Sequence, residues 1–284
     1  MKKVFLTLLI ICAACSSSIA QSGGFAGASM RIGFGPRGLG MGNAMSAHTH
    51  QGVYGYYNPA LSAAITDRKQ FDLSVASMSF DRELQNLAAA FPLPPNAGLT
   101  VYLSRAGVDQ IDGRTLSGFH TGYLSTNEYQ VATSFGIRLS ERFYGGFGLK
   151  INISDLDDEL AAETNFGIDL GLLARLTDHI NLGIAVQDLI SEFTYNSSGL
   201  FGQNQAQNVT NQFPTRIKFA GAYQRENWVF SSEYEIRIQN SSILEPELSL
   251  FGGQPGVLNS EREITTSSTL LRLGGAYRIH ERLT

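Results

Sequence analysis

The stretch from Gly33 to Ala44 reads GFGPRGLGMGNA, and Gly33, Gly35 and Gly38 have the spacing G-x-G-x-x-G. That spacing binds the pyrophosphate of a dinucleotide when it joins a buried strand to a helix inside a βαβ unit. Here the preceding residues are rich in Gly and Ser and form no apolar strand, and Pro36 removes a backbone N–H that a phosphate would use. We therefore expect no nucleotide cofactor and a structural role for these glycines.

Two other groups of residues have types that could bind a metal ion. His48 and His50 form H-x-H, which on a strand would point both imidazoles to one face, but the sequence shows no third ligand. A run of acidic residues (Asp155, Asp157, Asp158 and Glu159) offers calcium-type oxygens without the glycine and distal glutamate of an EF-hand. We expect a solvated acidic loop and no metal cofactor.

No serine or histidine lies in a recognisable nucleophile motif, so an enzyme is not expected. The net charge of −4 argues against nucleic acid as a partner. The functional class therefore has to come from the elements along the chain.

Residues 1–20 have the three parts of a secretory signal peptide: Lys2 and Lys3, an apolar run, and small residues up to Ala20. We expect cleavage near Ala20 and an exported mature chain. The alternative is a lipoprotein signal at Cys15, although the position three residues earlier is Cys12 where Leu is usual. Both cysteines of the chain lie in this segment, so the mature protein would have no disulfide.

From residue 129 onward the side chains alternate between apolar and polar, which is the pattern of β-strands with one buried face. Strands are predicted at 129–139, 143–153, 166–176, 180–187, 216–224, 228–238 and 271–279, with weaker ones at 71–80, 84–91 and 98–104. Most of these about ten strands have the 9–11 residues that a tilted strand needs to cross a hydrocarbon layer.

The connections predict which side of a membrane each strand end faces. Short turns (PLPPNA, SER, TD and QREN) alternate with long segments at 106–128, 154–164, 191–214 and 239–268. This asymmetry is typical of outer-membrane barrels, with the short turns in the periplasm. Phe143, Tyr223, Trp228 and Tyr277 lie beside the short turns, as an aromatic girdle would.

We predict an all-β, antiparallel transmembrane outer-membrane β-barrel over residues 70–284, in contact with outer-membrane lipid. The alternative is a soluble β-sandwich with its apolar faces inward. Polar faces that mix Gly, Ser and Asn with charged residues favour a barrel lumen. Because the sequence stops at Thr284 just after a short turn, we expect an incomplete barrel that lacks roughly four strands.

The segment before the first strand carries a family resemblance. Residues 35–44, GPRGLGMGNA, and 56–61, YYNPAL, resemble the N-terminal signature of the PorV/PorQ family, relatives of the FadL-type fatty-acid transporters. The resemblance implies a barrel of about 14 strands with residues 21–69 as a plug in the lumen. The plug motif would comprise Gly35, Arg37, Gly38, Gly40, Met41, Gly42, Asn58 and Pro59.

We expect Gly38, Gly40 and Gly42 to present a small-residue face that packs against the barrel wall. Arg37 would pair with a lumen carboxylate such as Asp169 or Glu233, or remain solvated.

The resemblance leaves two functions open. PorV/PorQ proteins serve type IX secretion in Bacteroidota-like bacteria, which implies cargo proteins or secretion-machinery subunits as partners at the extracellular loops. The alternative is a FadL-like passive transporter of long-chain fatty acids or other hydrophobic small molecules. Its candidate pocket, which could equally be ordinary packing, comprises Phe34, Met41, Met45, Tyr56 and Tyr57.

Overall fold

The computed structural model describes residues 26–49, 52, 54–64, 68–156, 162–196, 208–251 and 254–278. Its main sheet consists of β1 (Gln70–Met78), β2 (Arg82–Leu93), β3 (Ala97–Arg114), β4 (His120–Arg138), β5 (Phe143–Asp155), β6 (Glu163–Arg175), β7 (Ile180–Leu189), β10 (Thr215–Arg225), β11 (Trp228–Phe251) and β12 (Gln254–Tyr277). A second, two-stranded sheet pairs β8 (Glu192–Asn196) with β9 (Asn208–Gln212) in the β7–β10 connection. Among the described residues, three short elements precede β1: η2 (Ser29–Arg31), α2 (Gly35–Gly40) and η3 (Pro59–Ala64).

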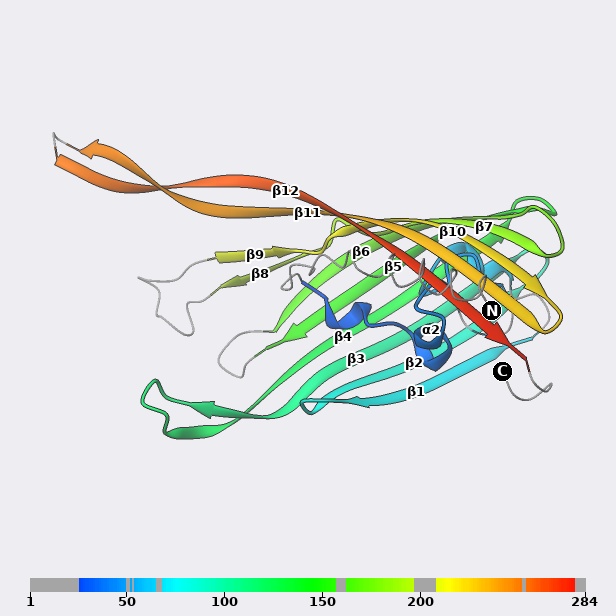
Figure 1. Ribbon diagram of the computed structural model, residues 1–284, viewed down its shortest axis with the longest axis horizontal. Helices are drawn as coiled ribbons and strands as arrows, with labels where there is room; N and C mark the ends of the chain where they lie inside the picture. Colours follow the sequence, from blue (N-terminus) through cyan, green and yellow to red (C-terminus); the bar gives the residue numbers. More distant parts are fainter. Residues whose placement is uncertain are drawn as a thin grey trace, which may run out of the picture.

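Every strand of the main sheet pairs antiparallel with its neighbours in chain order, from β1 at one edge to β12 at the other. The sheet is therefore a simple up-and-down meander, and it curves around the N-terminal segment (Figure 1). None of the helices in the described part of the chain is long and apolar enough to cross a membrane.

The polarity of the two sheet faces is the reverse of that in a soluble protein. On the convex face Leu73, Phe166 and Leu271 are 75%, 68% and 65% exposed, whereas the concave face buries Lys150 and Asp169 to 3% and 2% exposure. Apolar side chains outward and charged side chains inward suit a barrel whose outer surface meets lipid. This arrangement excludes the soluble sandwich.

The predicted girdle residues lie together at the end of the sheet that carries the short turns. Trp228 and Tyr277 are directly paired across β11 and β12, with ring centroids 4.4 Å apart. Phe143, Tyr223, Trp228 and Tyr277 are all exposed on the outer face, which is where an interfacial aromatic belt lies.

All four segments predicted as long loops contain β-structure, so that part of the prediction is wrong; in 154–164 it is limited to the end of β5 and the start of β6. β3 and β4 continue as a hairpin as far as Arg114 and His120, β11 and β12 stay paired as far as Phe251 and Gln254, and 191–214 contains β8 and β9. These extensions project to the side away from the short turns (Figure 1). The β3–β4 extension was missed because most of its side chains are exposed on both faces, so the sequence there needs no apolar alternation.

A small charged cluster stabilises the tip of the β3–β4 hairpin, outside the membrane-spanning part. His120 Nδ1 lies 2.6 Å from Asp112 Oδ1, and Arg114 Nε donates to Asp112 Oδ2 at 2.8 Å. The hydrogen bond from His120, followed by that from Arg114, holds the pKa of Asp112 below its ordinary value. A carboxylate with a lowered pKa stabilises the folded hairpin above its ordinary pKa and loses that effect as pH falls through the lowered value.

We therefore expect His120→Gln to raise the pKa of Asp112 towards its ordinary value and to move fraying of the hairpin to higher pH. Carboxyl ¹³C NMR titration of Asp112 measures this shift directly. His179→Gln, in a distant turn, is the control and should leave the Asp112 titration unchanged. An unchanged Asp112 pKa in His120→Gln would contradict the assignment of His120 as its main partner.

Candidate functional site

The lumen wall carries a row of glycines at one depth. Gly98, Gly136, Gly146 and Gly171 are directly paired across β3, β4, β5 and β6. We call these four residues the glycine row. They face the 3-10 turn η3, which contacts all four of these strands.

The glycine row allows the plug backbone to touch the barrel wall. A Cβ on Gly136 would lie 2.6 Å from Ala63 N, and one on Gly146 would lie 2.5 Å from both Ala60 N and Pro59 C. Backbone atoms at such distances cannot give way, so only glycine fits. Sequence reasoning missed this site, because the signal appears only when the register places the four glycines at equal depth.

Asn58, at the start of η3, joins the plug to β6 and, through a longer contact of 3.5 Å from its Nδ2 to Ile184 O, to β7. Its Nδ2 donates to Ser46 O at 2.8 Å and to Leu172 O of β6 at 3.1 Å, while its Oδ1 accepts from Ala60 N at 3.0 Å. The side chain is fully buried. The predicted motif residues Asn58 and Pro59 thus lie where the plug enters the glycine row.

We expect Asn58→Ala to destabilise the folded barrel by roughly 1–3 kcal/mol, because it leaves buried carbonyls without their donor. Chemical unfolding of the refolded protein in micelles measures this loss. Asn96→Ala is the matched control: Asn96 Nδ2 donates to Arg138 O at 3.2 Å, but in an exposed turn, so the cost should be smaller. Equal costs for the two variants would contradict the role given to Asn58.

Tyr57 fixes the glycine-rich segment around α2. Its hydroxyl accepts from Phe34 N at 2.9 Å and lies 2.9 Å from Asn43 Oδ1. Asn43 Nδ2 in turn donates to Ile32 O at 2.8 Å. Gly38 lies against this hydroxyl, where any Cβ would clash.

Of the three glycines that we expected to pack against the barrel wall, only Gly42 does so. Gly42 has φ +60° and lies against β12, where a Cβ would be 3.0 Å from Leu273 O. Gly38 packs within the plug, and a Cβ on Gly40 would meet no atom within 4 Å. Gly35, with φ +71°, opens α2. Met41, next to Gly42, is buried.

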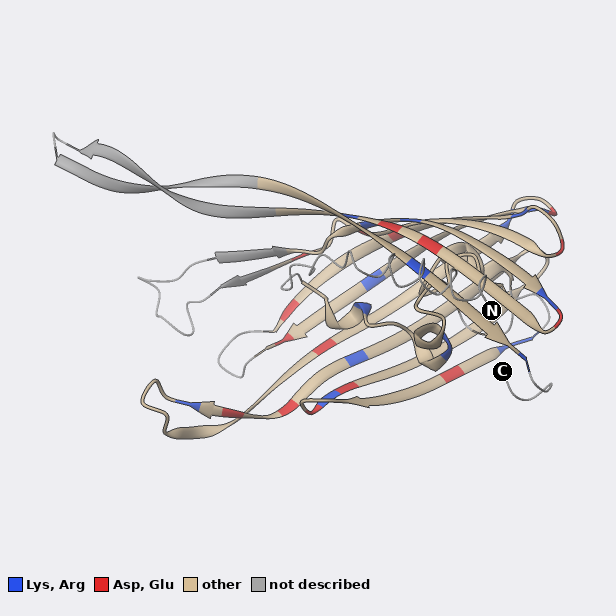
Figure 2. Ribbon diagram, viewed as in Figure 1, with Lys and Arg blue, Asp and Glu red and all other residues tan. Residues whose placement is uncertain are grey.

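The lumen also contains a buried charge cluster, which we call the Asp188 cluster. Asp188 lies at a register shift between β6 and β7 and has φ +61°. It pairs with Lys150, with Arg216 at 2.8 Å, and with Arg31 of the plug at 3.3 Å. Asp169 completes the cluster, 2.7 Å from Lys150. Figure 2 shows the charged residues of the wall on neighbouring strands.

Arg37 contacts a plug tyrosine, and the two carboxylates considered for it contact wall residues. Arg37 Nη1 donates to Tyr54 Oη at 3.3 Å. The carboxylates named for it pair with wall residues: Asp169 with Lys150, and Glu233 with Arg272 at 3.1 Å. Arg31, which the motif does not include, is a plug arginine that reaches a lumen carboxylate, Asp188.

The five candidate pocket residues are brought together, but in a packed cluster. Phe34, Met41, Met45, Tyr56 and Tyr57 are all buried in one apolar core with wall residues such as Tyr102. The ring of Phe34 lies 5.3 Å from that of Tyr56, which lies 5.5 Å from that of Tyr102. Their geometry is that of packing between plug and wall.

A cavity of about 330 Å³ borders this cluster between α2 and β1. Phe34, Pro36 and Tyr54 line it from the plug, and Asp72 and Leu73 line it from β1. Phe34 and Tyr54 are buried while Leu73 is exposed, so the cavity lies between the plug and β1, the edge strand of the sheet.

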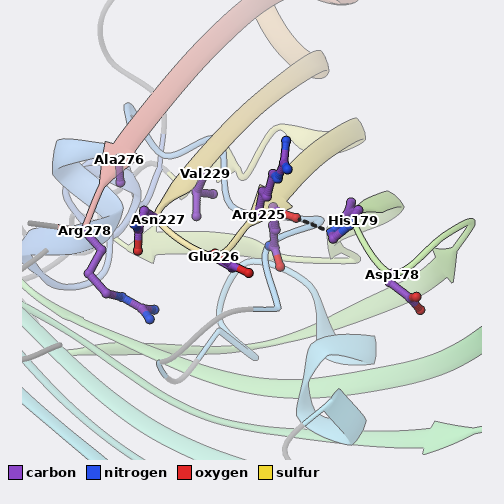
Figure 3. Close-up of a pocket in the computed structure, with 9 residues that line it drawn as sticks. Asp178, His179, Arg225, Glu226, Asn227, Val229, Ala276 and Arg278 are labelled. Carbon is purple, nitrogen blue, oxygen red and sulfur yellow. Dashed lines mark hydrogen bonds between the residues drawn. The ribbon is translucent and has the colours of Figure 1, made fainter. Parts of the chain in front are cut away.

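A second cavity, of about 200 Å³, lies at the rim with the short turns (Figure 3). Asp178 and His179 reach it from the β6–β7 turn, and Arg225 and Glu226 from the β10–β11 turn, with Arg278 beyond β12. The lining contains side chains of both charges at the rim that carries the short turns.

The residues considered for metal binding do not form a site among the residues described. His48 is buried with its ring 5.0 Å from that of Tyr54, and His50 lies outside the described residues. Asp155 ends β5, and the rest of the acidic run (157–159) also lies outside them. No group of three metal-ligating side chains occurs in the described part of the chain.

Comparison with solved structures decides the fold. The Pseudomonas putida toluene transporter TodX matches with a TM-score of 0.56 and 13% identity over 88% of this chain and 81% of that one. The Ralstonia pickettii toluene transporter TbuX matches with a TM-score of 0.55 and 14% identity, over 87% of this chain and 83% of that one. The CymD monoaromatic hydrocarbon channel matches with a TM-score of 0.54 and 14% identity, over 87% of this chain and 80% of that one. The chain has the fold of a FadL-like outer-membrane β-barrel.

The sequence comparisons add a partial match. A family model described as "F plasmid transfer operon, TraF, protein" matches residues 131–235, from within β4 to within β11 of the FadL-like barrel. No curated protein matches the chain.

Proposed function

We propose that this FadL-like barrel is a passive outer-membrane channel for small hydrophobic molecules. The observation that supports it best is the cavity between α2 and the edge strand β1, which is lined by buried plug residues and by the exposed Leu73. Its volume lies within the range of small-molecule sites, roughly 300–1,000 Å³. The toluene transporters and the hydrocarbon channel that share this fold support the same class of solute.

The cavity suggests how a hydrophobic solute avoids the charged lumen. Phe34, Pro36 and Leu73 offer apolar contacts, while Arg37 and Asp72 place polar groups at the same cavity. A solute that passes between the plug and β1 contacts Phe34, Pro36 and Leu73 and avoids the buried Asp188 cluster. Contact with that cluster would be unfavourable because it would desolvate charged groups.

Uptake of labelled toluene and of a labelled long-chain fatty acid tests this function in a host from which the gene has been deleted and to which wild-type or variant copies are returned. Leu73→Trp should narrow the cavity and lower uptake severalfold. Val75→Trp, two residues along the same exposed face of β1, lines no part of this cavity and is the control. Normal uptake in the deletion strain would contradict the transport function.

The second candidate is the PorV/PorQ-type role in type IX secretion, with cargo proteins or secretion-machinery subunits as partners. The observation that favours it is the β3–β4 hairpin, whose tip exposes Leu116, Phe119 and Tyr123 beyond the bilayer. If the gene deletion traps secreted proteins in the periplasm, and a shortened β3–β4 hairpin does the same without changing toluene uptake, secretion replaces transport as the function.

Both candidates place the mature chain in the outer membrane after cleavage near Ala20, with no enzymatic role. N-terminal sequencing of the protein from an outer-membrane fraction tests the cleavage site.

A further inference from the structure

The outer surface of the barrel has a groove of about 490 Å³ across β7, β10, β11 and β12. Gly221 of β10 and Ser232 of β11 form its floor and are directly paired across the two strands. These two small residues interrupt a surface that otherwise carries large apolar side chains, so the groove is a depression in the lipid-facing face.

Large apolar side chains surround this floor. Leu182 pairs with Gly221 on one side and Leu273 pairs with Ser232 on the other. Tyr223 and Phe230, also directly paired, bound the groove towards the short turns. All four are exposed in the chain itself, so their apolar surfaces are free to contact a molecule in the bilayer.

We propose that this groove binds one acyl chain of a phospholipid in the periplasmic leaflet. The groove is continuous with the membrane-facing surface. Because Tyr223, which bounds the groove, belongs to the aromatic girdle beside the short turns, the groove lies just inside the bilayer from that girdle. A chain lying over Gly221 approaches the sheet more closely than over any large side chain and gains dispersion contacts with the surrounding rings.

The charges at this end of the barrel suit a phospholipid with a zwitterionic headgroup. Arg225 is directly paired with Trp228 and lies two residues beyond Tyr223, on the same outer face. It is therefore placed for the phosphate at headgroup level, while Glu226 and Asp178 in the adjacent turns carry the opposite charge. Phosphatidylethanolamine, with a phosphate and an ammonium group, matches this arrangement.

The chain contains its own reporter for the groove. Trp228 is the single tryptophan, and its ring stacks on that of Phe230, with centroids 5.7 Å apart and an interplanar angle of 9°. A bromine atom on an acyl chain in the groove would therefore quench the tryptophan fluorescence.

The test is a titration of the full chain, refolded in detergent micelles, with phosphatidylethanolamine brominated on its acyl chains. We expect saturable quenching of Trp228. Gly221→Leu and Ser232→Leu fill the floor and should require roughly three- to tenfold more lipid for the same quenching, the range for the loss of one or two buried methylene contacts. A Cβ at Gly221 has its nearest neighbours at 3.7 and 3.8 Å, so the variants should still fold.

Gly145→Leu is the matched control, because Gly145 lies on the outer face of β5, away from the groove, with its nearest neighbour at 3.5 Å from a Cβ. The fluorescence of Trp228 in this variant should be quenched at the same lipid concentrations as in the wild type. Identical titrations for Gly221→Leu and wild type would overturn the proposal, since Trp228 would then sense only bulk lipid. Reversal of the quenching by toluene but not by unbrominated phosphatidylethanolamine would also overturn it, in favour of a small aromatic occupant.

Discussion

Replacing Gly146 by alanine is expected to destabilise the barrel by about 1–3 kcal/mol or more, the range for overpacking a well-packed interior, and to release the plug from the wall. The added methyl group would lie 2.5 Å from Ala60 N and from Pro59 C, which are backbone atoms of η3. Neither can rotate away as a side chain does. Either η3 leaves the glycine row, or β5 bends outward and strains its pairing with β4 and β6.

Gly145→Ala is the matched control, one residue earlier on the same strand. Its methyl group points to the lipid side, where the nearest atom is 3.5 Å away in ordinary contact. Chemical unfolding in micelles should separate the two variants clearly, and trypsin should cleave the plug at Arg37 faster in Gly146→Ala than in Gly145→Ala. If the two variants unfold alike and resist trypsin equally, the glycine row does not hold the plug.

The contrast between these neighbours shows what the sequence could predict. Alternation along 143–153 placed Gly145 on the apolar face and Gly146 on the polar one, and the structure confirms both. The wall strands were predictable because each carries its own signal, repeated every second residue. That signal says nothing about depth, so the alignment of Gly146 with Gly136 and Gly171 became visible only with the register of the strands.

The sequence predicted where the plug motif lies, but not which contacts its side chains make. Family resemblance pointed to Asn58 and Pro59, and the structure places them at the glycine row. Arg37 was considered as a lumen cation because it lies in the motif, with solvation as the alternative, whereas the plug cation at Asp188 is Arg31. A short segment without periodic structure has no rule that sets side-chain direction, so the choice between two arginines six residues apart could not be made from the sequence.

The Asp188 cluster is the second place where one substitution should have a large effect. Asp188 and Lys150 are 1% and 3% exposed, and Arg216 is 6% exposed. Lys150, Arg216 and Arg31 all contact Asp188, so Asp188→Asn would leave three buried cations with Asp169 as the remaining carboxylate of the cluster. Breaking a buried pair by removing one partner costs about 3–5 kcal/mol.

We therefore expect Asp188→Asn to lower the free energy of unfolding by about that amount, and Asp155→Asn, at the exposed end of β5, to change it by less than about 0.5 kcal/mol. Asparagine keeps the size of the side chain, so the loss reports charge and not packing. Chemical unfolding in micelles measures both. A cost for Asp188→Asn as small as that for Asp155→Asn would show that the lumen is solvated enough to screen these charges.

A double-mutant cycle then asks whether the cluster holds the plug or only the wall. Arg31→Met removes the plug cation and leaves the wall cations, so in the Asp188→Asn background it should restore part of the stability, with a coupling energy of roughly 1–3 kcal/mol. Trypsin cleavage at Arg37, which both variants keep, reports whether the plug is released. Additive effects of the two substitutions would mean that Asp188 serves the wall alone, and that the glycine row and Asn58 hold the plug without it.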